Sequence, residues 1–87
     1  MLHDKNESVI LGMGRAAKNT MLVFRYLEVN PIIDIRKTAD VLGIAFNTVS
    51  GAVNRLVSAG ILAPTSNTSR NRTFAYEAYL AILRKGT

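Results

Sequence analysis

The residues best suited to chemistry in this chain are short polar side chains on one side of a predicted helix over residues 46–58. At 100° per residue, Val49, Val53 and Leu56 share its apolar side, with Phe46 at the edge. The opposite side carries amides, hydroxyls, a glycine and an arginine instead of the lysines and glutamates of an ordinary solvent face. Such groups hydrogen-bond base edges and phosphates in a DNA groove. The predicted base contacts are Asn47, Thr48, Ser50, Asn54 and Arg55.

The residues before this helix predict a second helix and a turn that hold it in place. Residues 34–42 have a helical pattern, with Asp34 suited to cap the helix and apolar residues spaced i, i+4, i+7 on its inward side. Gly43 supplies the positive φ of a tight turn. The spacing predicts a helix-turn-helix over residues 34–60, and the alternative is an ordinary helical hairpin. Ala45 leaves the second helix without a side-chain cap.

The chain after this helix pair predicts an antiparallel hairpin. Gly60 is suited to end the helix, residues 61–63 form the first strand, and residues 73–76 form the second. A helix pair followed by a basic-tipped hairpin is typical of a winged helix-turn-helix, whose hairpin contacts the DNA backbone or minor groove. The predicted phosphate contacts are Arg70 and Arg72 on the hairpin, and Arg36 and Lys37 at the start of the first helix of the pair.

A further helix is predicted over residues 16–29, and it is apolar around most of its circumference. Met21, Leu22 and Val29 lie on the side turned away from its inward face. Such a helix requires a second cover. The alternatives are residues 9–14, a neighbouring catalytic domain absent from this chain, or a homodimer formed through these three side chains.

The ends of the chain complete the predicted architecture. Residues 1–15 are expected to be a partly ordered arm outside the core, with His3 solvated, because glycines interrupt their only apolar run. Residues 31–33 form an extended stub that can pair with a later strand, and residues 77–83 form a helix that covers the core. We therefore expect one mainly α (α+β) winged helix-turn-helix domain over residues 16–87.

The composition limits the function classes. With 87 residues, the chain is expected to be a single domain, and no apolar run is long enough to cross a bilayer. The absence of cysteine excludes disulfides and thiolate chemistry, and a cytoplasmic location is expected. Eleven Lys and Arg against six Asp and Glu give a net charge of +5, which suits a polyanion. No paired carboxylates, nucleophile–base pair or phosphate loop are present, so neither an enzyme nor a cofactor or metal site is predicted.

A series of short motifs runs through residues 16–84: NPII at 30–33, LGI at 42–44, NTV at 47–49, GIL at 60–62, and RNRTF at 70–74 followed by YE at 76–77 and YL at 79–80. Together they resemble the C-terminal winged-helix segment of bacterial Fic-family (filamentation induced by cAMP) proteins. In that family a separate upstream domain transfers AMP to protein hydroxyls, and the winged segment is regarded as DNA-binding or accessory. The resemblance implies a parent Fic domain as a partner. It does not imply catalysis, because the His-Pro-Phe…Gly-Asn-Gly-Arg motif is absent.

Two functions of different classes follow from the sequence. The first is a domain that binds duplex DNA, as a transcription regulator or as an appendage of a Fic-type protein. The second is a protein-interaction module that dimerises or docks a catalytic domain without binding DNA. A continuous positive face from the helix at residues 46–58 to the hairpin favours the first function. An apolar patch on the helix at residues 16–29 as the only organised surface favours the second.

Overall fold

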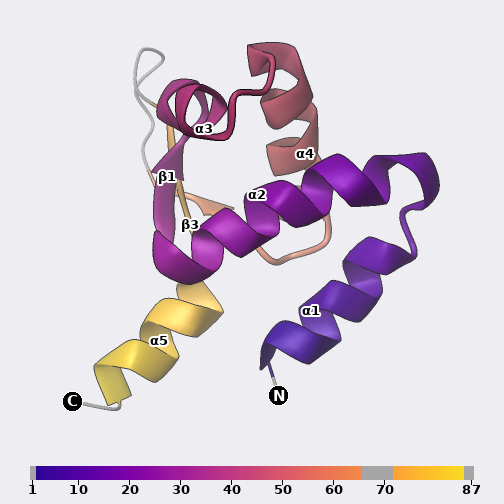
Figure 1. The fold of residues 1–87 in the computed structure, drawn as a ribbon. Coiled ribbons are helices and arrows are strands. Elements are labelled where there is room, and N and C mark those ends of the chain that lie inside the picture. Colours follow the sequence, from indigo (N-terminus) through magenta and orange to yellow (C-terminus); the bar gives the residue numbers. More distant parts are fainter. Residues whose placement is uncertain (1, 66–71, 86–87) are drawn as a thin grey trace.

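The computed structural model describes residues 2–65 and 72–85 and consists mainly of helices around a small antiparallel sheet (Figure 1). This confirms the predicted mainly helical α+β fold class. The elements in chain order are α1 (Leu2–Leu11), the 3₁₀ turn η1 (Gly14–Ala16), α2 (Ala17–Val29), β1 (Ile32–Asp34), α3 (Ile35–Leu42), α4 (Phe46–Ser58), β2 (Ala63–Pro64), β3 (Thr73–Ala75) and α5 (Glu77–Lys85).

The sheet has the order β1-β3-β2, and both pairs are antiparallel. The expected pairing of the stub before α3 is confirmed, since Ile33 of β1 lies opposite Phe74 of β3. The expected hairpin also forms, with Ala63 opposite Ala75. Its first strand is shorter than predicted, because Ile61 and the following leucine are buried in the core before the strand begins. The predicted tip, with Arg70, lies outside the described residues.

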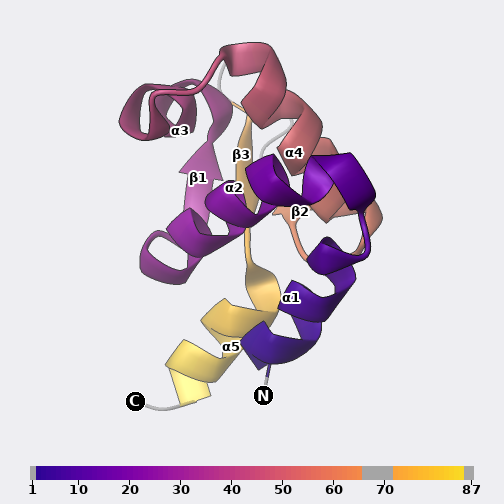
Figure 2. The same cartoon turned by 45° about the vertical axis from the view of Figure 1, so that its right-hand side comes forward.

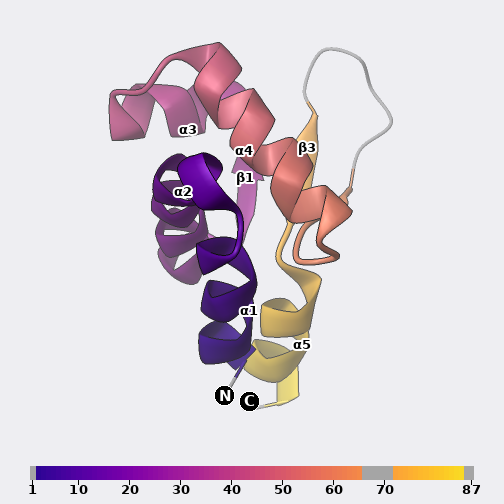
Figure 3. The same ribbon diagram turned by 90° about the vertical axis from the view of Figure 1, so that its right-hand side faces the viewer.

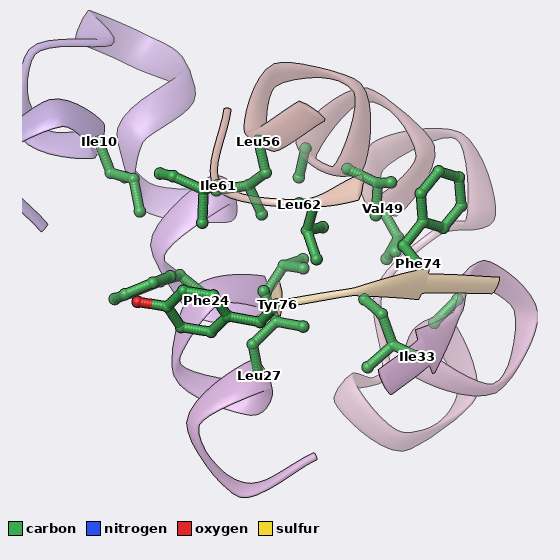
Figure 4. Packing of buried hydrophobic residues seen from close by; sticks show 14 residues of the cluster. Ile10, Phe24, Leu27, Ile33, Val49, Leu56, Ile61, Leu62, Phe74 and Tyr76 are labelled. Atoms are coloured by element: carbon green, nitrogen blue, oxygen red, sulfur yellow. The ribbon is translucent and has the colours of Figure 1, made fainter. Parts of the chain in front are cut away.

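The core lies between the helices and the buried face of the sheet. Figure 2 shows α2 crossing the middle of the molecule in front of the sheet, and Figure 3 shows it nearly end-on, with α4 and the sheet to one side of it and α1 below. Figure 4 shows side chains that meet from α1, α2, β1, α4 and β3 and from the segments just before β2 and α5. The residues labelled in this view are fully or almost fully buried: Ile10, Phe24, Leu27, Ile33, Val49, Leu56, Ile61, Leu62, Phe74 and Tyr76.

The end of α4 returns the chain to this core. Gly60 has φ +77°, a left-handed conformation in which a Cβ would be strained. The N–H groups of Gly60 and Ile61 donate to the carbonyls of Val57 and Leu56, at 3.0 and 2.9 Å. These two bonds satisfy carbonyls that the last turn leaves without helical partners. The turn places buried Ile61 against the core one residue after the glycine, so Gly60 ends the helix as predicted.

The N-terminal segment contradicts the expectation of a partly ordered arm outside the core. Residues 2–11 form α1, whose Ile10 is fully buried among the core side chains. The glycines end this helix instead of preventing it, and Gly14, with φ +66°, lies in the turn that leads into α2. Glu7 of α1 pairs with Arg25 of α2 at 3.7 Å. The prediction failed because the apolar contact depends mainly on one residue, which periodicity does not reveal.

His3 is likewise not solvated. Its Nδ1 lies 3.1 Å from the hydroxyl of Tyr76, and Nδ2 of Asn6 donates to the same hydroxyl at 2.6 Å. The His3 ring also stands edge-on to Tyr79 and Phe24, with centroids 4.8 and 5.9 Å away. Because Tyr76 is fully buried and directly precedes α5, this contact fastens the start of α1 to the far end of the chain.

The last helix covers less of the core than predicted. It extends two residues beyond the predicted end at residue 83, and Tyr79 packs against the core. Ile82 and Leu83 remain 52% and 44% exposed. Figure 1 shows α5 leaving the end of the sheet, and its contact with α1 is made near its start, where Tyr79 meets the ring of His3. The end of α5 therefore contributes less apolar surface to the core than predicted.

The predicted apolar excess on α2 is present in part. Met21 is partly buried and packs against the core, whereas Leu22 and Val29 are 42% and 80% exposed. The α1 helix packs along α2 and forms the ion pair with Arg25. Some of the cover expected from residues 9–14 is therefore supplied by α1, and the two exposed side chains remain.

Candidate nucleic-acid interface

The first helix of the predicted pair is set by its own N-terminal bonds. Oδ1 of Asp34 accepts the N–H of Lys37 at 2.7 Å, which confirms the predicted cap. The hydroxyl of Thr38 donates to the carbonyl of Asp34 at 2.7 Å, so this buried side chain is satisfied within its own turn. Because β1 ends at Asp34, the cap also fixes where the strand becomes a helix.

The turn between α3 and α4 has the geometry that its glycine predicts. Gly43 has φ +65° and ψ 33°, and the N–H of Ile44 donates to the carbonyl of Ala39 at 3.1 Å. Ala39 is almost fully buried, as expected where a small residue lets two helices approach. Ala45 makes no side-chain cap bond, as its chemistry requires. The predicted helix, turn and helix are all present.

The polar face of α4 lies where the sequence predicted it. Asn47 and Asn54 are exposed, and Thr48 and Ser50 are partly exposed. The apolar side chains on the opposite face, Val49, Ala52, Val53 and Leu56, are all fully buried. The helix is therefore fixed by one side and presents hydrogen-bonding groups on the other.

Arg55 is held against its own helix instead of extending freely. A Cβ placed on Gly51 would lie 3.4 Å from Nη1 of Arg55, an ordinary van der Waals distance, so the guanidinium packs directly beside Gly51. This Nη1 is shielded from water and has no hydrogen-bond partner among the described residues. A buried charged donor without an acceptor is unfavourable, and a phosphate or guanine acceptor would relieve it.

The basic residues form a second group at one end of the sheet. Arg36 and Lys37 are exposed in the first turn of α3, and Arg72 is exposed directly before β3. Since Asp34 lies opposite Thr73, the sheet register brings the residue before β3 beside the start of α3. The structure thus brings these three cations to the end of the sheet where β1 ends and β3 begins. Arg70 lies outside the described residues.

Phe46 lies at the edge of the apolar side of α4, as the sequence predicted. It is the first residue of α4, and its side chain is 49% exposed. The helical wheel indicated this position, since Phe46 lies at the boundary between the two faces, but it does not give the exposed fraction of the ring.

Comparisons of the chain with protein-family models, curated proteins and solved structures gave no match. Across residues 2–65 and 72–85, no helix combines the length and hydropathy that crossing a membrane requires. The described part of the chain also contains no group of three or more His, Cys, Asp or Glu suited to hold a metal ion. The candidate site is the surface formed by the exposed polar face of α4 and the exposed cations at the start of α3 and before β3.

Proposed function

We propose that this protein binds duplex DNA as a winged helix-turn-helix domain, with α4 in the major groove. The observation that carries the proposal is the exposed face of α4, which offers amides and hydroxyls but no carboxylate along all thirteen residues of the helix. Carboxylates are repelled by phosphates, whereas short polar groups can approach base edges closely. The buried opposite face holds the helix rigidly while it presents these groups.

The proposed roles divide the site in two. Asn47, Ser50 and Asn54 contact base edges, with Thr48 and Arg55 at the margin of the same face. Arg36, Lys37 and Arg72, together with Arg70, contact phosphates and set the register. Phosphate contacts supply most of the affinity in such a complex, and base contacts supply its sequence preference. The function served is transcription regulation, either by this chain itself or as the DNA-binding appendage of a Fic-type protein.

A salt titration tests the proposal. Binding of a labelled mixed-sequence duplex, followed by anisotropy, should weaken steeply as salt rises. Replacing Arg36 and Lys37 by Ala should lower the slope of log affinity against log salt by roughly 1 to 2, because fewer counterions are released. The matched control replaces Lys5 and Lys18, which are exposed on α1 and α2, and removes the same charge. Equal slopes for the two variants, or no binding by the native chain, would refute the proposal.

A second function is favoured by the apolar side chains that α2 and α5 leave in water. Leu22 and Val29 on α2, and Ile82 on α5, are each more than 40% exposed. These side chains suit a protein partner, including a second copy of the chain that pairs through the α2 patch predicted at Met21, Leu22 and Val29. Sedimentation of the native chain and of a Leu22→Lys, Val29→Glu variant tests the dimer. We expect a native dimer that the variant dissociates, and a monomeric native chain would contradict it.

A further inference from the structure

One aromatic side chain of α4 is not accounted for by the core. Phe46 is 49% exposed, whereas Val49, Val53 and Leu56 of the same helix have no exposed surface. An aromatic ring contributes stability mainly through the apolar area that it removes from water. Half of that benefit is unused here, so the core alone does not explain a phenylalanine at this position.

The ring stands at the leading end of the proposed recognition helix. Phe46 is its first residue, and Ala45 before it is small, exposed and makes no cap bond. One turn further along, Ser50 lies on the same side, because residues four apart share a helix face. The exposed neighbours of Phe46 on this helix are therefore hydrogen-bonding groups rather than further large apolar side chains.

We propose that Phe46 contacts the C5-methyl group of thymine and makes the site selective for thymine at one position. This inference depends on the proposed binding of duplex DNA by α4. In the major groove, thymine presents a methyl group beside its O4 acceptor, and its adenine partner presents a donor and an acceptor. On α4 the ring is flanked by amide and hydroxyl groups, which matches this combination of one apolar and several polar positions. A protein-docking patch would instead require contiguous apolar neighbours.

Duplexes that differ only in the methyl group test the inference. The probes are alternating adenine–thymine and adenine–uracil duplexes of equal length, and guanine–cytosine duplexes with and without the cytosine C5-methyl group. The native chain should bind the methylated member of each pair roughly fourfold more tightly, which is the effect of burying one methyl group. Phe46→Ala should remove this preference and keep the salt dependence of binding. Leu11→Ala, at an exposed site on α1, should keep both.

The outcomes separate the inference from the proposed function. Salt-dependent binding by the native chain with equal affinity for methylated and unmethylated duplexes would overturn the role of Phe46 and leave DNA binding intact. A preference that persists in Phe46→Ala would also overturn it. Absence of binding to every duplex would refute both proposals. If circular dichroism shows that Phe46→Ala is unfolded, Phe46→Gln replaces it, since a polar side chain of similar reach should also lose the preference.

Discussion

The α3–α4 pair and the α1–α2 pair pack on the same core, but different interactions position them. The bonds that shape the α3–α4 pair join residues close in sequence, such as Asp34 with Lys37. The bonds that hold α1 join residues 70 and 73 positions apart, through Asn6, His3 and Tyr76. One pair is shaped by its own chain segment, and the other by contacts that exist only in the folded molecule.

The difference extends to the polar side chains. His3 and Asn6 direct their side chains into the protein, where both meet the hydroxyl of Tyr76. Among the described residues, no internal hydrogen bond involves the side chain of Asn47 or Asn54. The polar groups of α1 thus serve the fold, whereas those of α4 remain available for a partner. Substitutions in each region test this difference.

The largest expected effect tests whether α1 belongs to the core as fully as α4 does. Ile10→Ala and Leu56→Ala both remove fully buried side chains, so each should lower the free energy of unfolding by about 2–5 kcal/mol. Val9→Ala, beside Ile10 but 45% exposed, should change it by less than about 1 kcal/mol. Urea denaturation measures all three. A small loss for Ile10→Ala would show that α1 is a detachable arm after all.

A smaller effect is expected at the turn of the helix pair. Gly43→Ala places a Cβ in the left-handed region and should cost about 1–2 kcal/mol of unfolding free energy. Space is not the cause, since no atom lies within 4 Å of that Cβ position. Gly43→Asn is the matched control, because asparagine tolerates this conformation better. Equal losses for the two variants would mean that the backbone conformation is not responsible.

The core contact of α1 and the turn of the helix pair also show which parts of the fold could be predicted from the sequence. Gly43, Gly60 and the cap at Asp34 act through bonds within a few residues, so their types and spacing indicated the helix pair, its turn and the polar face of α4. The burial of Ile10 and the hydrogen bond of His3 depend on residues far away in the sequence. The sequence of α1 alone does not indicate which residues these are.

The candidate site could be predicted to a similar extent. The helical wheel identified the side chains of the α4 face, because helix geometry is regular. The contact of Arg55 with Gly51 and the extent to which Phe46 is exposed depend on packing that the wheel does not describe.

Removing the cap of α3 and adding one to α4 should each change the unfolding free energy by about 1 kcal/mol, in opposite directions. Asp34→Ala removes the bond to Lys37 and should cost about 1 kcal/mol of unfolding free energy. Ala45→Ser supplies a hydroxyl where α4 has no cap, and should contribute a similar amount of stability. Thermal unfolding followed by circular dichroism compares the two. A destabilised Ala45→Ser variant would show that its hydroxyl does not reach the helix start.

The smallest expected effect is a pH dependence of the unfolding free energy that arises from Tyr76, the residue that contacts α1. Burial raises the pKa of the Tyr76 phenol above its ordinary value of about 10, and the nearby Glu28, Tyr79 and Glu7 act in the same direction, whereas the bond from Asn6 opposes them. The folded state therefore retains the phenol proton longer than the unfolded state does. This contribution to stability is complete below about pH 10 and is lost as pH rises from there through the higher folded-state pKa.

Tyr76→Phe provides the comparison for this pH dependence. The variant loses the contacts of the hydroxyl with His3 and Asn6, so it should be less stable than the native chain near neutral pH. Its unfolding free energy should then fall less steeply above pH 10. Parallel curves for the two proteins in urea titrations would assign the alkaline loss to other groups.

The central claim is that the outward face of α4 is a binding surface for duplex DNA. Titration of the isotopically labelled chain with a mixed-sequence duplex, followed by amide chemical shifts, tests it most directly. The predicted result is a set of shifts concentrated at Asn47, Ser50 and Asn54 and around Arg36 and Arg72, with α1 and α5 unchanged. Shifts confined to Leu22, Val29 and α5, or none at any protein-to-DNA ratio, would contradict the claim.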